Sequence, residues 1–450
     1  MINDLLHHTA DLASKYLDGL DSRPVGASGE TPTFEAIPED PIDPKKVIDE
    51  LVEVAEPGLV ASCGPRYFGF VTGGAEPAAL AADWLVSTWD QNAVFHVSSP
   101  AAAALEQTAA AWVLDLLDLP AQSSVAFVTG CQMAHVTALA AARHRVLASV
   151  GWSVSEQGLF GAPPIAVVVG EHRHSTVDRA LRLLGFGNDA LVPVTGDQMG
   201  RMVVGDLHDV LGSLTGPKIV VAQSGEVNTG SFDAIDEIAD VVAGTDAWLH
   251  VDGAFGMWAR ATNRFASLTK GTERADSWAF DAHKWLNVPY DSGLAVVADR
   301  EAHAAAMSYG GAYLVPTEQR RDAMDWTPEA SRRARGIPVY AAIRSMGRNG
   351  ISDLVERCCD LALRFARGLV DVPGAQLIAE PVINQVLFRF DDDARTTQVL
   401  ARLQDGGVAW MGPTRWDGRA AIRVSVSNWM TTEADIDLTL EAFRSAAAAR

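Results

Sequence analysis

Short apolar runs alternate with amphipathic stretches between about residues 75 and 300. The runs have strand length, and the segments between them carry apolar residues at helical spacing. Strands that alternate with helices predict an α/β domain with a mostly parallel central sheet. The predicted strands are 123–129, 165–169, 190–194, 218–222, 247–251, 277–280 and 293–297.

The chain before residue 75 has a different pattern. Residues 3–19 carry apolar side chains at helical spacing, and the stretch 23–43, rich in Pro, Gly and Glu, predicts a linker. An amphipathic helical arm must pack either on its own chain or on a partner subunit. Residues 1–72 are therefore predicted to be an N-terminal helical arm and linker that form a dimer contact.

The C-terminal third predicts a smaller α+β domain. It follows an Arg-rich stretch at 332–335, and it has a helix, three strands and a last helix at 351–370, 376–379, 384–390, 421–427 and 433–447. The boundaries that follow are 73–340 for the large domain and 341–450 for the small one.

Composition narrows the class of protein. The chain has 450 residues, 48% of them hydrophobic and 21% charged, which is typical of a globular protein with a sizeable core. A formal charge of -21 argues against nucleic acid as a partner. No run of 18 apolar residues predicts a membrane span, and the Ala-rich stretch 101–113 predicts a helix. Four cysteines without a disulfide framework and no evident signal peptide favour the cytoplasm.

Lys284 and Asp252 are the strongest candidates for chemistry. Each follows a predicted strand, at the edge where open α/β sheets bind ligands. Alone, either would more often be a surface lysine or a turn aspartate. Together they match the two needs of pyridoxal phosphate, which are a lysine that holds the aldehyde as a Schiff base and a carboxylate that keeps the pyridine nitrogen protonated.

Two further segments fit the same site. Gly130, Cys131 and Gln132 lie between a strand and an Ala-rich helix, whose N-terminus suits a phosphate group; an ordinary strand-to-helix turn is the alternative. His174 follows the strand 165–169 and could stack on a cofactor ring, although a helix-entry histidine is equally consistent. Asn228 places an amide near the same edge, and Tyr313 is a candidate pocket residue. The remaining histidines show no metal-ligand spacing, so no metal is predicted.

These motifs in this order resemble the pyridoxal-phosphate-dependent amino-acid decarboxylases of the aromatic-L-amino-acid and glutamate decarboxylase group. The resemblance rests on His174-Ser-Thr-Val, His250-Val-Asp252-Gly-Ala254 and His283-Lys284-Trp, and it runs from about Pro65 to Arg423. It implies a lyase of amino-acid metabolism with the type I pyridoxal-phosphate fold. That fold is an obligate homodimer whose active site lies at the subunit interface.

The resemblance also implies residue roles. Lys284 becomes the Schiff-base lysine, Asp252 the partner of the pyridine nitrogen, and His174 and Ala254 the residues on the two ring faces; Lys284, His174 and Asp252 form the predicted catalytic set. The predicted cofactor-binding residues are Gly130, Cys131, Gln132, His174, Asn228, Asp252, Ala254, Asp281, His283 and Lys284. The predicted substrate-binding residues are Phe70, Thr72, Asn92, Val94 and Tyr313.

This chain departs from the pattern at three places. The phosphate loop has Cys131-Gln132-Met133 where small or hydroxyl residues are more usual. The loop 315–326 lacks the tyrosine that donates the final proton in the aromatic decarboxylases, and members without it can turn to oxygen-consuming aldehyde formation. Asp281 stands where many members have Asn, so a carboxylate beside the phosphate needs a compensating donor such as His283.

The favoured function is decarboxylation of an L-amino acid with an aromatic or bulky side chain, since Phe68, Phe70, Trp89 and Phe255 are candidates to line an apolar pocket. One alternative is a decarboxylating oxidase that gives aldehyde, ammonia and peroxide, and another is a different lyase or a transaminase on the same scaffold. A third is a degenerate homologue that only binds, against which the retention of Lys284 and Asp252 argues.

Overall fold

The computed structural model describes residues 2–27, 29, 36–309 and 322–449. Its contacts divide the chain into two compact units, which are described separately. The first contains Met1–Thr72, Leu361–Glu380 and Val386–Arg450, and the second contains Gly73–Asp360 and Pro381–Gln385. Tyr313 and residues 315–321 of the loop without a tyrosine lie outside the described residues.

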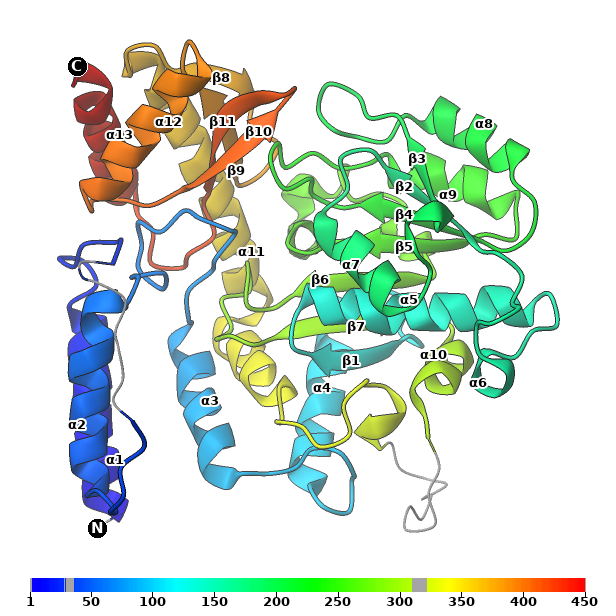
Figure 1. Cartoon of the computed structure of the whole chain (residues 1–450), viewed down its shortest axis with the longest axis horizontal. Helices are drawn as coiled ribbons and strands as arrows, with labels where there is room; N and C mark the ends of the chain where they lie inside the picture. Colours follow the sequence, from blue (N-terminus) through cyan, green and yellow to red (C-terminus); the bar gives the residue numbers. More distant parts are fainter. Residues whose placement is uncertain (1, 28, 30–35, 310–321, 450) are drawn as a thin grey trace. The chain divides into compact units, whose positions relative to one another are not determined.

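The second unit is built on one sheet with the order β1-β7-β6-β5-β4-β2-β3 (Figure 1). All seven predicted strands form, and only β7 runs antiparallel to its neighbours, so the prediction of a mostly parallel central sheet is confirmed. The strands are β1 (Ser124–Val128), β2 (Ala166–Gly170), β3 (Leu191–Val194), β4 (Lys218–Gln223), β5 (Trp248–Asp252), β6 (Ser277–Asp281) and β7 (Gly293–Val297).

Helices cover this sheet because its central strands are apolar on both faces. Every residue of β1, β5, β6 and β7 is buried, which is the pattern of a sheet covered on both sides. Helix α5 runs across β1, β7, β6, β5 and β4, and its alanines allow close approach. The helices of this part of the chain are α3 (Pro77–Trp89), α4 (Pro100–Leu116), α5 (Cys131–Ala148), α6 (Val154–Gln157), α7 (Ser175–Leu183), α8 (Val204–Ser213), α9 (Ile235–Ala243), α10 (Arg300–Met307) and α11 (Gly336–Gly368).

Helix α11 is longer than the predicted helix at 351–370. It begins at Gly336 and breaks at Gly347, whose φ of 63° lies in the left-handed region that favours glycine. The sequence pattern found only the part that follows this break.

A buried ion pair ties α4 to the segment that precedes α11. The Arg332 guanidinium donates to Glu106 over 2.8 and 2.5 Å, and the two side chains are 1% and 8% exposed. The bidentate geometry offsets the cost of burying both charges, so removal of one partner would leave the other uncompensated.

The first unit holds a four-stranded sheet with the order β10-β11-β9-β8. Phe365, Phe388 and Phe443 form an aromatic cluster with centroid separations of 5.4 to 6.0 Å. Strand β10 and helix α12 were not predicted, and Pro413 explains the first omission because proline is tolerated only on such an edge strand. The elements are α1 (Ile2–Asp18), α2 (Pro44–Ala55), β8 (Gln376–Ala379), β9 (Gln385–Arg389), α12 (Asp393–Asp405), β10 (Gly412–Trp416), β11 (Arg419–Ser425) and α13 (Glu433–Ala448).

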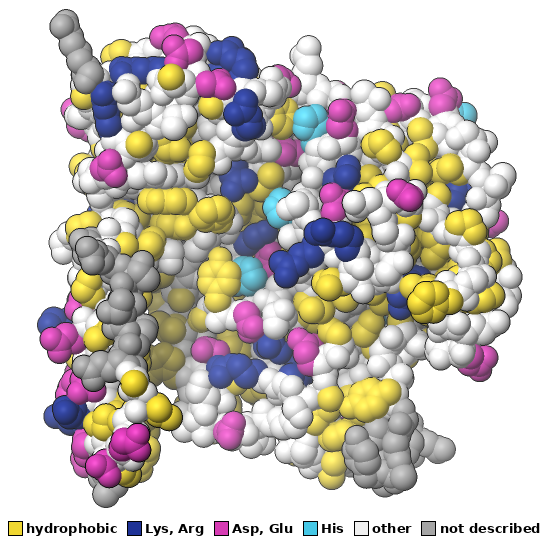
Figure 2. Space-filling model, in the orientation of Figure 1, with side chains coloured by type: hydrophobic (Ala, Val, Ile, Leu, Met, Phe, Trp, Pro, Cys, Tyr) yellow, Lys and Arg dark blue, Asp and Glu magenta, His cyan; other side chains and the backbone are white. Residues whose placement is uncertain are grey.

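The N-terminal helices expose their apolar side chains. Helices α1 and α2 contain no buried residue, although both are amphipathic. Leu6 and Leu51 are 51% and 53% exposed, and Figure 2 shows hydrophobic side chains among acidic and basic ones on this segment, at the lower left. Among the described residues, no helix is long and apolar enough to cross a membrane.

Candidate cofactor-binding site

The register of the sheet brings three strand ends to one level. Asp281 at the end of β6 lies opposite Gly293, and Gly293 lies opposite Val128 at the end of β1. A side chain on Gly293 would place its Cβ 2.4 Å from the Gly130 Cα, so only glycine permits this approach. The N-terminus of α5 therefore comes directly against the Asp281 carboxylate.

Asp281 is the centre of a charged cluster. Its Oδ2 lies 3.0 Å from Lys284 Nζ, its Oδ1 lies 3.3 Å from His283 Nε2, and Oδ1 accepts the Cys131 backbone N–H over 2.5 Å. Burial alone lowers the pKa of Lys284, but the Asp281 carboxylate outweighs it and raises that pKa above its ordinary value. Burial lowers the pKa of His283. Donors thus surround the Asp281 carboxylate.

A second glycine, Gly73, packs closely against the backbone of Lys284. A Cβ on Gly73 would lie 1.7 Å from the Lys284 carbonyl oxygen, which excludes any side chain there. The same carbonyl accepts the Asn287 N–H over 3.2 Å. Sequence reasoning missed this contact, and its one available signal was the Gly73-Gly74 pair.

Asp252 is buried at the end of β5, with a side chain that is 5% exposed. Its Oδ1 accepts the Ala254 N–H over 3.1 Å, and its Oδ2 lies 3.5 Å from His135 Nε2. Burial by itself raises the pKa of Asp252, but His135, His174 and the Ala254 N–H lower it well below the ordinary value. Asp252 therefore stays ionised and can balance one positive charge in the site.

Sequence reasoning also missed the histidines behind Asp252. His135 on α5 and His250 on β5 are both fully buried and lie 2.9 Å apart, from Nδ1 to Nε2. The signal available in the sequence was the spacing of four between Cys131 and His135, which puts both side chains on one helix face.

Gln132 supplies an unpaired polar group at the start of α5. Both its Oε1 and its Nε2 are buried, and neither has a hydrogen-bond partner within the part of the chain that the structure describes. An unsatisfied buried amide at a helix N-terminus fits an anionic ligand group. An amine at Lys284, a carboxylate at Asp252 and a polar cradle at Gln132 therefore fit pyridoxal phosphate.

Of the remaining predicted cofactor residues, His174 and Ala254 lie beside Asp252. His174 precedes α7, and its Nδ1 lies 2.8 Å from Thr176 Oγ1. The Ala254 carbonyl accepts the Asp281 N–H over 2.9 Å, so this residue joins the two carboxylates. Asn228 Nδ2 donates to Glu226 Oε1 over 2.8 Å, and it is this internal contact that orients the amide.

The predicted substrate residues are less concentrated. Asn92 Oδ1 accepts the Arg332 N–H over 3.1 Å, and the buried Val94 accepts the Met324 N–H through its carbonyl. Phe70 and Thr72 belong to the first unit, where the Phe70 ring lies 5.4 Å from that of Trp410. Phe68 and Phe255 are each 1% exposed, which makes them core residues.

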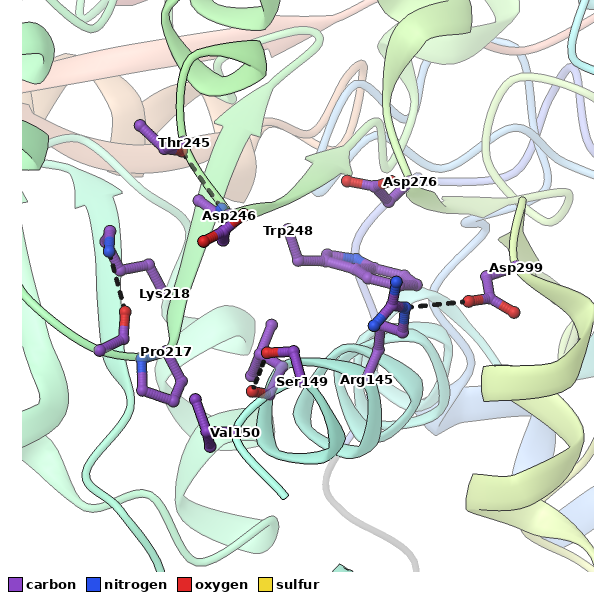
Figure 3. Close-up of a pocket in the computed structure, with 13 residues that line it drawn as sticks. Arg145, Ser149, Val150, Pro217, Lys218, Thr245, Asp246, Trp248, Asp276 and Asp299 are labelled. Atoms are coloured by element: carbon purple, nitrogen blue, oxygen red, sulfur yellow. Dashed lines mark hydrogen bonds and ion pairs between the residues drawn. The ribbon is translucent and has the colours of Figure 1, made fainter. Parts of the chain in front are cut away.

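A separate cavity lies at the opposite ends of the strands. Its volume is about 570 Å³, and it contains none of the predicted site residues. Figure 3 shows Lys218 and Trp248, which begin β4 and β5, beside Arg145 and Asp299, whose charged groups lie 3.4 Å apart. The cofactor site is thus distinct from this cavity.

Comparison with known proteins agrees with pyridoxal phosphate as the cofactor. The family described as "Pyridoxal-dependent decarboxylase conserved domain" matches residues 30–391. An L-2,4-diaminobutyrate decarboxylase of Rhizobium meliloti is 29% identical over 81% of this chain and 74% of its own length. A 3,4-dihydroxyphenylacetaldehyde synthase of Drosophila melanogaster is 26% identical over 91% of this chain and 83% of its own.

Solved structures share the fold. The crystal structure of Oryza sativa TDC with PLP and tryptamine superposes with a TM-score of 0.91 at 23% identity, and covers 99% of this chain and 97% of that one. The predicted type I fold and the predicted cofactor, pyridoxal phosphate, are confirmed.

Asp281→Asn should shift the pH dependence of covalent cofactor uptake. Only the deprotonated Lys284 amine attacks an aldehyde, and loss of the Asp281 charge lowers the Lys284 pKa, so uptake should become half-maximal at a lower pH. The introduced amide oxygen can still accept the Cys131 N–H. The measurement is the rate of borohydride-fixed cofactor formation by apoprotein between pH 6 and 10, with the exposed Asp209→Asn as the matched control. An unchanged or upward shift would contradict the pairing.

Proposed function

This chain belongs to the pyridoxal-dependent decarboxylase family, and from that premise we propose that it removes the α-carboxyl group of an L-amino acid with an aromatic or bulky side chain. The products are the amine and carbon dioxide. The observation that carries the proposal is the placement of Lys284 and Asp252 at one edge of the sheet, each with the partners that its charge requires.

Each residue has a distinct task in this reaction. Pyridoxal phosphate supplies an aldehyde for the lysine and a protonated ring that withdraws electrons from the substrate α-carbon. Asp252 is held ionised, so it favours the protonated ring nitrogen. The Asp281 carboxylate lies 3.0 Å from the Lys284 amine, so it orients this amine and stabilises its protonated form. Gln132 and the N-terminus of α5 would hold the phosphate.

The substrate class rests on relatives and neighbours. The TDC structure with PLP and tryptamine shares the fold, and the aldehyde synthase of Drosophila melanogaster carries the name of an aromatic product. The diaminobutyrate decarboxylase shows that the family also contains an enzyme named for a basic substrate. We favour the aromatic or bulky class, with Phe70, Thr72, Asn92, Val94 and Tyr313 as the substrate residues.

A second candidate function is the decarboxylating oxidase. Its support is the similarity to a relative named as an aldehyde synthase, together with the loop 315–326, which has no tyrosine to donate the last proton. Molecular oxygen would then accept the electron pair that protonation would otherwise take up, and water would supply the aldehyde oxygen. The products would be carbon dioxide, aldehyde, ammonia and hydrogen peroxide.

Product analysis separates the two functions. Cofactor-loaded protein should convert a member of a panel of L-amino acids, with aromatic ones first, to the amine at equal rates in air and under nitrogen. The measurement is mass spectrometry of the products, with oxygen and peroxide followed in parallel. Aldehyde that forms only in air would establish the oxidase instead, and a requirement for a keto acid would indicate a transaminase.

Removal of Lys284 or Asp252 should have different signatures. Lys284→Ala should bind no cofactor covalently and should lose turnover. Asp252→Ala should retain cofactor but lose roughly a hundredfold or more in kcat, because the ring nitrogen loses its counter-charge. The measurements are borohydride fixation, absorption spectra and steady-state kinetics, with the exposed Lys270→Ala as control. Full turnover in either variant would refute the assigned role.

We also propose a homodimer with the active site at the subunit interface. The apolar faces of α1 and α2 have no buried residue within the described chain, and a partner subunit would cover them. The division into an N-terminal arm (1–72), a large domain (73–340) and a small domain (341–450) likewise stays a proposal, beside the two compact units that divide at Thr72 and at Asp360.

Charge on this face should weaken the dimer. Leu6→Asp combined with Leu51→Asp should shift the protein from dimer to monomer in analytical ultracentrifugation at micromolar concentration, because two charges would then be buried in an apolar contact. Leu438→Asp, on the exposed face of α13, is the matched control. A wild-type monomer, or a dimer that tolerates both charges, would contradict the proposal.

A reducing compartment suits the cysteines. Cys63, Cys131, Cys358 and Cys359 are all free, and three of the four are buried. We therefore propose that the enzyme works in the cytoplasm.

A further inference from the structure

Four buried polar side chains follow one another from Asp252 into the sheet, each close to the next. We call this row the file. His135 Nε2 lies 3.5 Å from Asp252 Oδ2, and His135 Nδ1 lies 2.9 Å from His250 Nε2. His250 Nδ1 lies 2.8 Å from Ser277 Oγ, which accepts the Trp248 indole N–H over 2.8 Å. All five residues are buried, and they come from α5, β5 and β6.

The Trp248 end of the file fixes the direction in which its hydrogen bonds donate. An indole nitrogen only donates, so Ser277 Oγ accepts from Trp248. Within the described residues, His250 is the other partner of this hydroxyl, so its hydrogen points to His250 Nδ1. His250 then carries its own hydrogen on Nε2 and donates to His135 Nδ1. His135 in turn carries its hydrogen on Nε2, which lies 3.5 Å from Asp252 Oδ2 and 3.4 Å from Cys131 Sγ.

The reverse direction is costly. It would leave the Ser277 hydrogen without an acceptor. It would also give His135 either a buried positive charge or a bare Nε2 beside a carboxylate, where the weak S–H donor of Cys131, 3.4 Å away, is its replacement partner. The forward direction satisfies each hydrogen while both imidazoles stay neutral. Burial lowers the pKa of His250 to about 3, which agrees with a neutral ring.

We propose that His135 is a positioning residue for Asp252, and that the file from Trp248 through Ser277 and His250 fixes its tautomer. A neutral N–H then orients the carboxylate and holds it ionised without adding a second cation to the site. The inference rests on the proposed function, because Asp252 is the group that acts on the cofactor. His135 works only through Asp252.

The same neighbourhood contains donors that could hold a metal ion. One ligand atom from each of Cys131, His135 and Asp252 lies within 4.8 Å of the others. Burial, with the Asp252 and Asp281 charges, raises the pKa of the Cys131 thiol well above its ordinary value, and a protonated thiol is a poor ligand. The hydrogen that the file places on His135 Nε2 also blocks the lone pair with which this nitrogen would bind a metal ion.

The outer end of the file borders the cavity described above. Trp248 lines this cavity, which lies at the other ends of the strands from Asp252 (Figure 3). Trp248→Phe therefore removes the N–H that sets the direction at a point remote from the cofactor.

The first test uses apoprotein and needs neither cofactor nor substrate. Nitrogen-15 NMR of histidine-labelled protein, assigned with His135→Gln and His250→Gln, should show both rings neutral at pH 7 with the hydrogen on Nε2. Trp248→Phe should perturb the His250 signal. A cationic His135, a hydrogen on His135 Nδ1, or one bound metal ion per chain by metal analysis would overturn the proposal.

The second test compares two replacements in the loaded enzyme. The amide nitrogen that His135→Gln introduces can take the place of Nε2, whereas His135→Leu introduces no donor. His135→Leu should lower kcat roughly 10- to 100-fold with little change in KM and should alter the cofactor absorption spectrum, while His135→Gln should recover most of both. His144→Leu, on the same helix, is the control, and thermal unfolding verifies that each variant folds.

The variants also separate this inference from the proposed function. In an Asp252→Asn background the difference between His135→Leu and His135→Gln should vanish, because the carboxylate on which they act is gone. Equal losses in both single variants would reduce His135 to a packing role. If the wild type formed neither amine nor aldehyde, the proposed function would fail. The tautomers of His135 and His250 seen by NMR would still test the direction of the hydrogen bonds in the file.

Discussion

The arrangement of the site depends on two buried carboxylates. Asp252 and Asp281 end neighbouring strands inside a sheet whose other residues are mostly apolar, where an unpaired charge would cost several kcal/mol. Each is therefore surrounded by donors: backbone N–H groups from Ala254 and Cys131, imidazoles, and the Lys284 amine. The site is the set of partners that these two charges require.

The sheet provides that set through register and small residues. Antiparallel β7 between β6 and β1 aligns Asp281 with the turn that begins α5, and glycines at 293 and 73 permit backbones to approach more closely than any side chain would allow. The helix N-terminus and the carboxylate thus meet at one edge, although 150 residues separate Cys131 from Asp281. Their positions depend on the sheet, which is more rigid than a loop.

The family likeness and the local chemistry answer different questions. The matched family and the shared fold establish a pyridoxal-phosphate enzyme, because the residues that bind the cofactor lie on the shared scaffold. Substrate choice and the fate of the last proton belong to the proposed function. In that proposal the amine and the aldehyde are separate chemical outcomes of one site, and the loop 315–326, which has no tyrosine, decides between them.

The sequence by itself determined the seven strands of the central sheet and the fold class, and it singled out the pair Lys284 and Asp252. Strand-length apolar runs and residues at their ends are local features, and a buried parallel sheet leaves a strong local pattern. It did not reveal β10, the break at Gly347, the Gly73 contact or the histidines behind Asp252. Those depend on which distant backbones and side chains meet, and only the tertiary structure decides that His135 on a helix reaches His250 on a strand 115 residues later.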